Sequence, residues 1–469
     1  MVTTNTNSSF DLVNRENELR TIDEALYRLT TPGRLLPKPI LEFNGIGGIG
    51  KTALLKKFRQ ECMEKKLHYS FVDFAEFDKA EQIDLNMIII NIVQQIDIKN
   101  DLFYQIISSA SEADPIQDLT PKVIEYLDLI LKKPQEEIPL ALIFDSVDEV
   151  DQNVKKWLIS IIDRTIEAGK ILYAVASKIS LGFSQLPKLE RRVYSFRLKE
   201  LDQKYTLEQL RVFSHFDEPE ELENWARAVY RLTHGHPLAN EIVMSEAKKK
   251  KYHPHNIDSI QYEFVQIIDQ QVVTEKVFHR YDSKEINRLR QILTPLSLPR
   301  LFNLVSMGKL IGKFAPEHAL RSSWHYSNYI RELQAETSFI HYSREKSAYV
   351  VDPILRSVFS LTLKNEELDK FGTMHEFLID MYTDWIADAR GTDKTKFFIE
   401  KTYHQLVLGE AADSLLPNFK DFAQIIGQNM SEDKCRDAKQ QFIMEFSLDP
   451  DLGEFFDESI KYKIRKMFE

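Results

Sequence analysis

The segment GIGGIGKT, residues 45–52, has the residue types and spacing of a phosphate-binding loop. It fits the pattern G-x-x-x-x-G-K-[ST], in which glycines let consecutive backbone N–H groups curl around a phosphate. The lysine then places a positive charge at the β- and γ-phosphates, and the threonine offers a hydroxyl to Mg²⁺. We predict nucleotide binding by the residues of this loop: Gly45, Ile46, Gly47, Gly48, Ile49, Gly50, Lys51, Thr52 and Ala53.

Acidic residues that could hold a metal and activate water follow an apolar run in PLALIFDSVDEVD, residues 139–151. Asp145 ends the run, and we predict that it holds Mg²⁺ together with Thr52, directly or through water. A further carboxylate must orient or deprotonate the attacking water, and Asp148 and Glu149 are the candidates. The segment alone could be an acidic surface turn, but its position after a phosphate loop favours the catalytic interpretation.

These groups need a scaffold that brings loops distant in sequence to one edge, and the chain has the pattern of one. Short apolar runs typical of strands occupy residues 38–43, 67–74, 139–145, 170–177 and 192–198. Residues 52–66 follow the phosphate loop with helical periodicity, and a helix N-terminus attracts anions. Strands alternating with helices predict an α/β P-loop NTPase domain with a parallel sheet.

Composition limits the class of protein. The chain has 469 residues, which predicts several domains, and 43% hydrophobic and 28% charged residues are ordinary for a globular protein. No apolar run approaches the roughly 18 residues that span a bilayer, and the polar start has no secretory-signal pattern. Two cysteines, Cys62 and Cys435, give no disulfide framework or metal-ligand spacing. We therefore expect a reduced cytoplasmic protein without membrane association. Its net charge of −11 disfavours nucleic-acid coating.

At four further points the chain resembles the STAND signal-transduction ATPases, which include the NACHT and NB-ARC proteins. FDLVNRENELRTIDEAL (10–26) is similar to the segment that covers the adenine in that family, which implies contacts from Val13 and Arg15, with Asn14 in place of a glycine. Ser146 and Asp148 follow Asp145 in the NACHT arrangement. ILYAVASK (171–178) resembles the sensor strand, and LTHGHPLANEI (232–242) resembles the G-x-P-L-A element.

The resemblance also implies roles for individual residues. Asp148 is the first choice for the water-orienting base and Glu149 the second. Lys178 stands where the family usually has an arginine, so it keeps the charge but loses the bidentate fork toward a γ-phosphate. Pro237 would close on the nucleotide from a helical subdomain, although a proline here also suits the first turn of a helix.

Four domains are expected: a nucleotide-binding domain (1–200), a helical subdomain (201–275), a winged-helix module (276–362) and an α-helical, TPR-like region (363–469). The resemblance covers about residues 10–360. Within the winged helix, residues 336–359 predict two strands around a wing and then a helix. Asp352 occupies the place of a histidine that contacts the β-phosphate of ADP in the family. A four-residue helical spacing predicts that Asp352 pairs with Arg356.

The resemblance implies a molecular switch that binds ADP or Mg-ATP and hydrolyses ATP slowly. We expect a signal felt by the C-terminal helices to allow nucleotide exchange, opening and homo-oligomerisation in the ATP-bound state. Few residues precede the adenine-covering segment, so we expect the output to reside in a separate effector protein, in stress or antiphage defence by analogy.

Two other functions remain open. An AAA+ initiator-like, DNA-acting ATPase also joins a P-loop domain to a winged helix, but residues 281–360 contain 11 Lys/Arg against 7 Asp/Glu, a weak footprint for nucleic acid. The other is a nucleotide-binding scaffold that does not cleave ATP, which the lysine at position 178 keeps open.

Overall fold

The structure is a computed structural model of the chain. It describes residues 12–76, 85–96, 121, 124, 127, 139–168, 170–213, 219–344, 346–389, 392–426, 431–453 and 455–469. The chain forms two compact units, Met1–His279 with Glu332–Phe339, and Arg280–Arg331 with Ile340–Glu469. Within the described ranges, every helix is too short or too polar to cross a bilayer.

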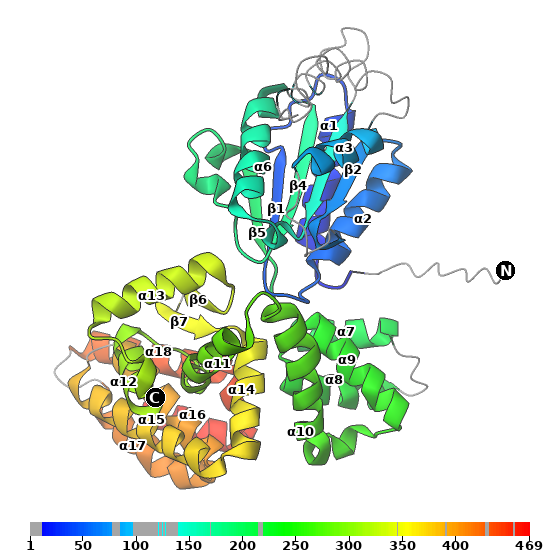
Figure 1. The fold of residues 1–469 in the computed structure, drawn as a ribbon. Coiled ribbons are helices and arrows are strands. Elements are labelled where there is room, and N and C mark those ends of the chain that lie inside the picture. Colours follow the sequence, from blue (N-terminus) through cyan, green and yellow to red (C-terminus); the bar gives the residue numbers. More distant parts are fainter. Residues whose placement is uncertain are drawn as a thin grey trace, which may run out of the picture. The chain divides into compact units, whose positions relative to one another are not determined.

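The first unit contains a five-stranded parallel sheet in the order β2-β3-β4-β1-β5 (Figure 1). Its strands are β1 (Ile40–Asn44), β2 (His68–Asp73), β3 (Leu140–Asp145), β4 (Ile171–Ser177) and β5 (Val193–Arg197). All five strands coincide with runs expected from the sequence. Every residue of β3 and β4 is buried, as expected for central strands of a parallel sheet that is covered on both faces. The predicted α/β P-loop architecture is confirmed.

Helices cover both faces of this sheet (Figure 1). α3 (Leu85–Ile96) and α6 (Gln152–Thr165) share one hydrophobic core with alternate sheet residues such as Leu140, Leu142 and Phe144. α1 (Glu16–Thr30) and α2 (Lys51–Glu64) contact each other and lie against β4 and β3. α2 begins directly after the phosphate loop, so its N-terminus points toward the edge where the carboxyl ends of the strands meet.

A helical segment follows the sheet in the same unit. It comprises α7 (Gln203–Phe213), α8 (Pro219–Thr233), α9 (Pro237–Lys250), α10 (Ile257–Ile268) and the π-helix η7 (Asp269–Val277). The helical character expected for residues 201–275 is therefore present. A π-helix is rare and is frequently found at functional sites. Here η7 ends two residues before His279.

The second unit contains the elements of a winged helix. α11 (Ser283–Ser297) is followed by a bridge between Phe302 and Tyr349, and then by α12 (Leu304–Phe314) and α13 (Ser323–Glu336), whose residues from Glu332 on belong to the first unit. The antiparallel strands β6 (Ile340–Ser343) and β7 (Ala348–Val351) lead into α14 (Pro353–Glu366). The expected order of strand, wing, strand and helix is confirmed.

The C-terminal region is helical, as expected. It contains α15 (Leu368–Asp388), α16 (Thr392–Val407), α17 (Leu416–Ile425), α18 (Glu432–Leu448), α19 (Pro450–Gly453) and α20 (Glu458–Phe468). Aromatic rings from four of these helices form its core; for example, Phe398 stacks on Phe422 with ring centroids 4.0 Å apart, and Phe442 stacks on Phe468 at 4.2 Å.

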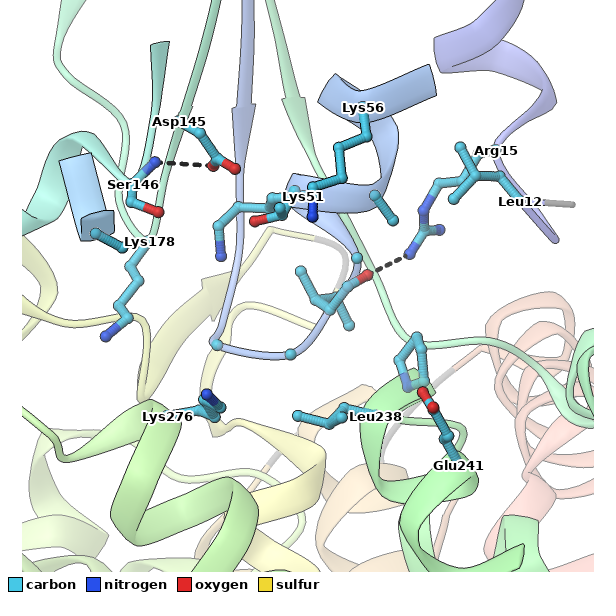
Figure 2. Close-up of a pocket in the computed structure, with 18 of the residues that line it drawn as sticks. Leu12, Arg15, Lys51, Lys56, Asp145, Ser146, Lys178, Leu238, Glu241 and Lys276 are labelled. Carbon is cyan, nitrogen blue, oxygen red and sulfur yellow. Dashed lines mark hydrogen bonds between the residues drawn. The ribbon is translucent and has the colours of Figure 1, made fainter. Parts of the chain in front are cut away.

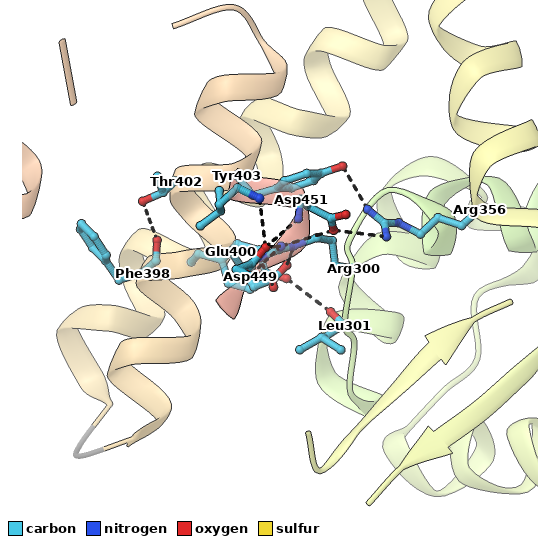
Figure 3. Close-up of polar contacts among 11 residues, drawn as sticks. Arg300, Leu301, Arg356, Phe398, Glu400, Thr402, Tyr403, Asp449 and Asp451 are labelled. Atoms are coloured by element: carbon cyan, nitrogen blue, oxygen red, sulfur yellow. Dashed lines mark hydrogen bonds and ion pairs between the residues drawn. The ribbon is translucent and has the colours of Figure 1, made fainter. Parts of the chain in front are cut away.

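A buried arginine joins the winged helix to these C-terminal helices (Figure 3). Arg300 donates to Glu400 Oε1 at 2.9 Å and to both carboxylate oxygens of Asp449 at 2.7 and 2.8 Å. Asp451 lies 3.4 Å from the same guanidinium. Burial alone would lower the pKa of Arg300, but Glu400, Asp449 and Asp451 raise it above its ordinary value. Arg300 is therefore a permanent cation among carboxylates.

Arg356 differs from expectation. Its guanidinium donates to Tyr403 Oη at 3.0 Å and lies 3.8 Å from Asp451, so it joins the cluster around Arg300 (Figure 3). The carboxylate of Asp352 instead caps α14, accepting the Ile354 N–H at 3.2 Å. An N-cap side chain turns toward the first backbone N–H groups of its own helix, which overrides the simple four-residue spacing.

Candidate nucleotide site

A cavity of about 790 Å³ lies at the carboxyl edge of the sheet, between the phosphate loop and the helical segment (Figure 2). That volume falls in the range of small-molecule and cofactor sites, roughly 300–1,000 Å³. Most residues predicted from the sequence line it: Val13, Arg15, Gly47, Gly48, Ile49, Gly50, Lys51, Thr52, Ala53, Asp145, Asp148, Glu149, Lys178 and Pro237. The fold thus brings together loops from five separate parts of the chain.

Lys51 lies within the phosphate loop itself. Its ammonium group donates to the carbonyl oxygens of Gly45 at 2.7 Å and Ile46 at 3.0 Å, so these two predicted loop residues contact the lysine through their backbones. Burial lowers the pKa of Lys51, and the nearby carboxylates of Asp148 and Asp145 oppose that shift. The lysine is therefore a buried cation with carboxylates around it.

Two glycines of the loop are required by packing as well as by backbone conformation. A Cβ on Gly47 would lie 2.7 Å from the carbonyl oxygen of Lys276, at the end of the π-helix. Gly48 has φ +83°, and a Cβ there would lie 2.6 Å from Cε1 of His236. The loop therefore needs glycine because the helical segment packs directly on its backbone.

His236 makes that packing specific. It is fully buried at the N-cap of α9, where its Nδ1 accepts the Ala239 N–H at 3.2 Å. Its Nε2 therefore carries the proton and donates to the carbonyl of Gly47 at 2.9 Å. Burial lowers the pKa of His236 to about 4, so the neutral ring that this geometry needs is the form present at neutral pH. Sequence reasoning named its neighbour Pro237 and missed this contact.

Asp145 has the properties of a cation ligand. One carboxylate oxygen accepts the Ser146 N–H at 2.8 Å, and the other is buried without a hydrogen-bond partner among the described residues. Burial raises the pKa of Asp145 to about 6, partly offset by the neighbouring Thr52 hydroxyl. A hard divalent cation such as Mg²⁺ would satisfy the unpaired oxygen, so Thr52 and Asp145 fit the expected metal pair.

The turn after Asp145 directs the next two acids into the cavity. Ser146 adopts a left-handed conformation with φ +56°, and Val147–Glu149 then form one turn of 3₁₀-helix. Asp148 accepts the backbone N–H of Lys178 at 2.8 Å, and its second oxygen lies 3.8 Å from the Lys178 ammonium. Since Lys178 follows β4, this contact joins the ends of β3 and β4.

Glu149 has a partner that sequence reasoning missed. Its Oε1 lies 2.5 Å from Nε2 of His279, and Nδ1 of the same ring lies 2.9 Å from the Lys178 ammonium. His279 is 130 residues from Glu149 along the chain, and no local pattern links the two. The candidate catalytic groups and the end of the helical segment therefore form one connected polar cluster.

Comparison with known proteins supports the assignment of the sheet and its loops. The family model described as nephrocystin 3, N-terminal, matches residues 33–177, from before β1 to the end of β4. No curated protein matches the sequence. The match contains the phosphate loop, Asp145 and both further acids. This region has the fold and the phosphate loop of a P-loop NTPase domain.

Several solved structures resemble this chain at low sequence identity. Cdc6p from Pyrobaculum aerophilum is 13% identical with a TM-score of 0.37, over 77% of this chain and 97% of that chain. Drosophila ORC bound to DNA is 13% identical with a TM-score of 0.36, over 74% and 86%. The Thermotoga maritima RuvB Holliday junction branch migration motor is 14% identical with a TM-score of 0.33, over 73% and 93%. TM-scores this low support no conclusion about function.

Arg15 joins separate parts of the ATPase domain. Its guanidinium is buried beside the cavity and donates to the carbonyl oxygens of Ile49 at 3.1 Å and Lys199 at 2.9 Å (Figure 2). It thereby ties the segment before α1 to the phosphate loop and to the chain after β5. A contact from Arg15 or Val13 to adenine stays a prediction.

Pro237 lines the cavity at the first turn of α9, and its carbonyl accepts from the Gln209 side chain at 3.1 Å. Asp73, which sequence reasoning missed, ends β2 directly beside Asp145 in the sheet and also lines the cavity. The sequence contained a signal for Asp73, because this acid lies near the C-terminal end of the apolar run at residues 67–74.

Proposed function

We propose that this protein is a nucleotide-dependent switch of the STAND type, which binds ADP or Mg-ATP at the phosphate loop and hydrolyses ATP slowly. The observation that carries this proposal is the packing of the phosphate loop on the helical segment. The carbonyl of Gly47 accepts from His236, and the backbone of Lys276 lies against the same glycine. The backbone that would cradle the phosphates is also the surface that holds the helical segment.

This arrangement supports coupling between nucleotide and conformation. A ligand shifts a conformational equilibrium only by as much as its contacts differ between the two states. Phosphates bound by loop N–H groups would change the geometry of the Gly47 carbonyl and of the catalytic turn, and both contact the helical segment. Replacing ADP with ATP would therefore alter the free energy of that packing.

Each residue of the site has a role in this proposal. Lys51 binds the β- and γ-phosphates, Thr52 and Asp145 hold Mg²⁺, and the metal neutralises phosphate charge when bound. Asp148 is the first candidate for the base that orients the water, and Glu149 is the second. Lys178 supplies a positive charge near the γ-phosphate, and Pro237 contacts the nucleotide from α9.

The switch would act through other molecules. We include in the proposal that the ATP-bound form assembles with copies of itself, that residues 363–469 receive the triggering signal, and that a separate effector protein carries the output. The winged helix is assigned to the switch rather than to DNA, because its balance of 11 basic against 7 acidic residues provides little attraction for phosphates.

Mass determination of the full chain with ADP and with ATP tests the switch, alongside single-turnover ATP hydrolysis. The expected result is a larger species with ATP, slow cleavage, and loss of both in Lys51→Ala. An unchanged mass together with ATP cleavage stimulated by DNA, and salt-dependent DNA binding at sub-micromolar concentration, would instead support the DNA-acting ATPase. Nucleotide binding without cleavage or mass change would support the scaffold.

A further inference from the structure

His279 connects the two candidate catalytic acids through a chain of four side chains. Nε2 of His279 lies 2.5 Å from Glu149 Oε1, and Nδ1 of the same ring lies 2.9 Å from the Lys178 ammonium. That ammonium in turn lies 3.8 Å from the Asp148 carboxylate. All four side chains are largely buried, with exposures of 6–16%. None of these contacts is a surface ion pair in bulk water.

The shortest contact of each ring nitrogen assigns the tautomer of the histidine. Nδ1 of His279 lies 2.9 Å from the Lys178 ammonium and 3.2 Å from the Lys276 carbonyl oxygen. The lysine contact is the shorter, and an ammonium group can only donate, so we assign Nδ1 as its acceptor. Nε2 then carries the proton and donates to Glu149, a charge-assisted hydrogen bond of the strong kind. One neutral ring thereby acts on both neighbours at once, as an acceptor for the lysine and as a donor to the glutamate.

The helical segment determines where this ring lies. The π-helix η7 ends at Val277, and its Lys276 carbonyl packs on Gly47 of the phosphate loop. His279 comes two residues later, so the same turn that touches the loop also places the imidazole between Glu149 and Lys178. Movement of the helical segment away from the loop would withdraw the imidazole from both.

We propose that His279 is a positioning residue that restrains ATP hydrolysis while the helical segment packs on the ATPase domain. A carboxylate oxygen that accepts a short hydrogen bond is a weaker base toward water, and an ammonium that donates to imidazole is held back from the γ-phosphate. Withdrawal of His279 removes both restraints together. The inference rests on the proposed function and adds the contact that couples domain packing to catalysis.

The test compares single-turnover ATP hydrolysis and ATP affinity in the full-length wild type, His279→Ala and His279→Gln. His279→Ala should raise the rate about 10-fold, the effect of losing one charge-assisted hydrogen bond, with the ATP dissociation constant within about 2-fold of wild type. A glutamine amide can donate to Glu149 and accept from Lys178, so His279→Gln should recover most of the restraint.

Two further variants make the result specific. In a Glu149→Gln background, the change His279→Ala should raise the rate by less than it does in the wild type, because only the restraint on Lys178 remains to be lost. His253→Ala changes an exposed histidine of the same helical segment and should match wild type. Thermal unfolding of each variant checks that all are folded.

The outcomes separate this inference from the proposal on which it rests. A folded His279→Ala protein that binds ATP but cleaves it at the wild-type rate or more slowly overturns the role of His279 alone. That role is also overturned if His279→Gln behaves like His279→Ala. Absence of ATP binding to the wild type would overturn the proposed function as well.

Discussion

The two units each contain a buried cluster of charged side chains, and the clusters differ in what supports them. Arg300 is matched by Glu400 and Asp449 at hydrogen-bond distances, with both side chains of the Arg300–Glu400 pair only 7–8% exposed. The side chains of the cluster of Asp148, Glu149, Lys178 and His279 are 6–16% exposed, against 7–31% around Arg300, so burial does not distinguish the two clusters.

The backbone that carries the charged side chains distinguishes the two clusters. Glu400 lies within the regular helix α16, and Asp449 is the C-cap of α18. Asp148 and Glu149 lie on a single 3₁₀ turn after left-handed Ser146, and His279 follows a π-helix. A cluster held by regular elements contributes to stability and specificity of fold, whereas one held by turns and an irregular helix can exchange its partners when a ligand binds.

The largest effect on stability is expected when the cation of the cluster in the second unit is removed. Arg300→Met leaves Glu400 and Asp449 buried without their cation, which should lower the free energy of unfolding of that unit by about 3–5 kcal/mol. Denaturant unfolding measures this change. Arg436→Gln, in an exposed pair with Asp433, is the control and should cost less than about 1 kcal/mol. Similar losses of unfolding free energy in both variants would mean that the Arg300 cluster stabilises the protein no more than an exposed ion pair does.

In the first unit, removal of a charge should alter chemistry more than stability. Asp148→Asn should keep Mg-ATP bound but slow single-turnover cleavage by about 10²-fold, as expected when a water-orienting base is removed. Glu149→Gln should have a smaller effect, and Asp145→Asn should change the Mg²⁺ dependence. Normal cleavage by Asp148→Asn together with an inactive Glu149→Gln would reverse the assignment of the base.

Lys51→Ala tests nucleotide binding apart from cleavage. The change removes a buried cation next to the predicted phosphate site and should weaken ATP and ADP binding by roughly 1.5–3 kcal/mol, the value of charge-assisted contacts. Isothermal titration calorimetry measures both affinities. Unchanged binding by a folded variant would contradict the assignment of the phosphate loop.

The smallest effect concerns pH and the His236 contact. Its folded pKa of about 4 lies below the ordinary value of about 6.5, so the unfolded chain binds more protons between these values and stability falls as pH drops through that window. At pH 5 the first unit should lose about 2 kcal/mol relative to neutral pH from this group. His236→Asn keeps an N-cap acceptor but removes the titration, so denaturant unfolding at both pH values should show a smaller loss than in wild type. Equal losses of stability in wild type and His236→Asn would mean that another titratable group causes the pH dependence.

Local pattern alone determined much of this protein. Glycine spacing identified the phosphate loop, and the apolar runs located all five strands, because a buried parallel strand and a phosphate-binding turn each demand particular residue types in consecutive positions. The same reasoning placed Asp145 at a strand end and predicted the two strands of the wing. These features depend on neighbours in the chain, so a single sequence contains them.

Tertiary structure alone decided which loops meet. The sheet places β4 between β1 and β3, an order that no local pattern specifies, and this puts Lys178 beside both the phosphate loop and Asp148. His236 lies 189 residues from the Gly47 carbonyl that it contacts, and His279 lies 130 residues from Glu149. Such contacts depend on how helices pack against a loop. They join residues far apart in the chain, so no spacing pattern in the sequence predicts them. Local sequence therefore determined the residue types of the candidate site, and packing determined which of those residues are in contact.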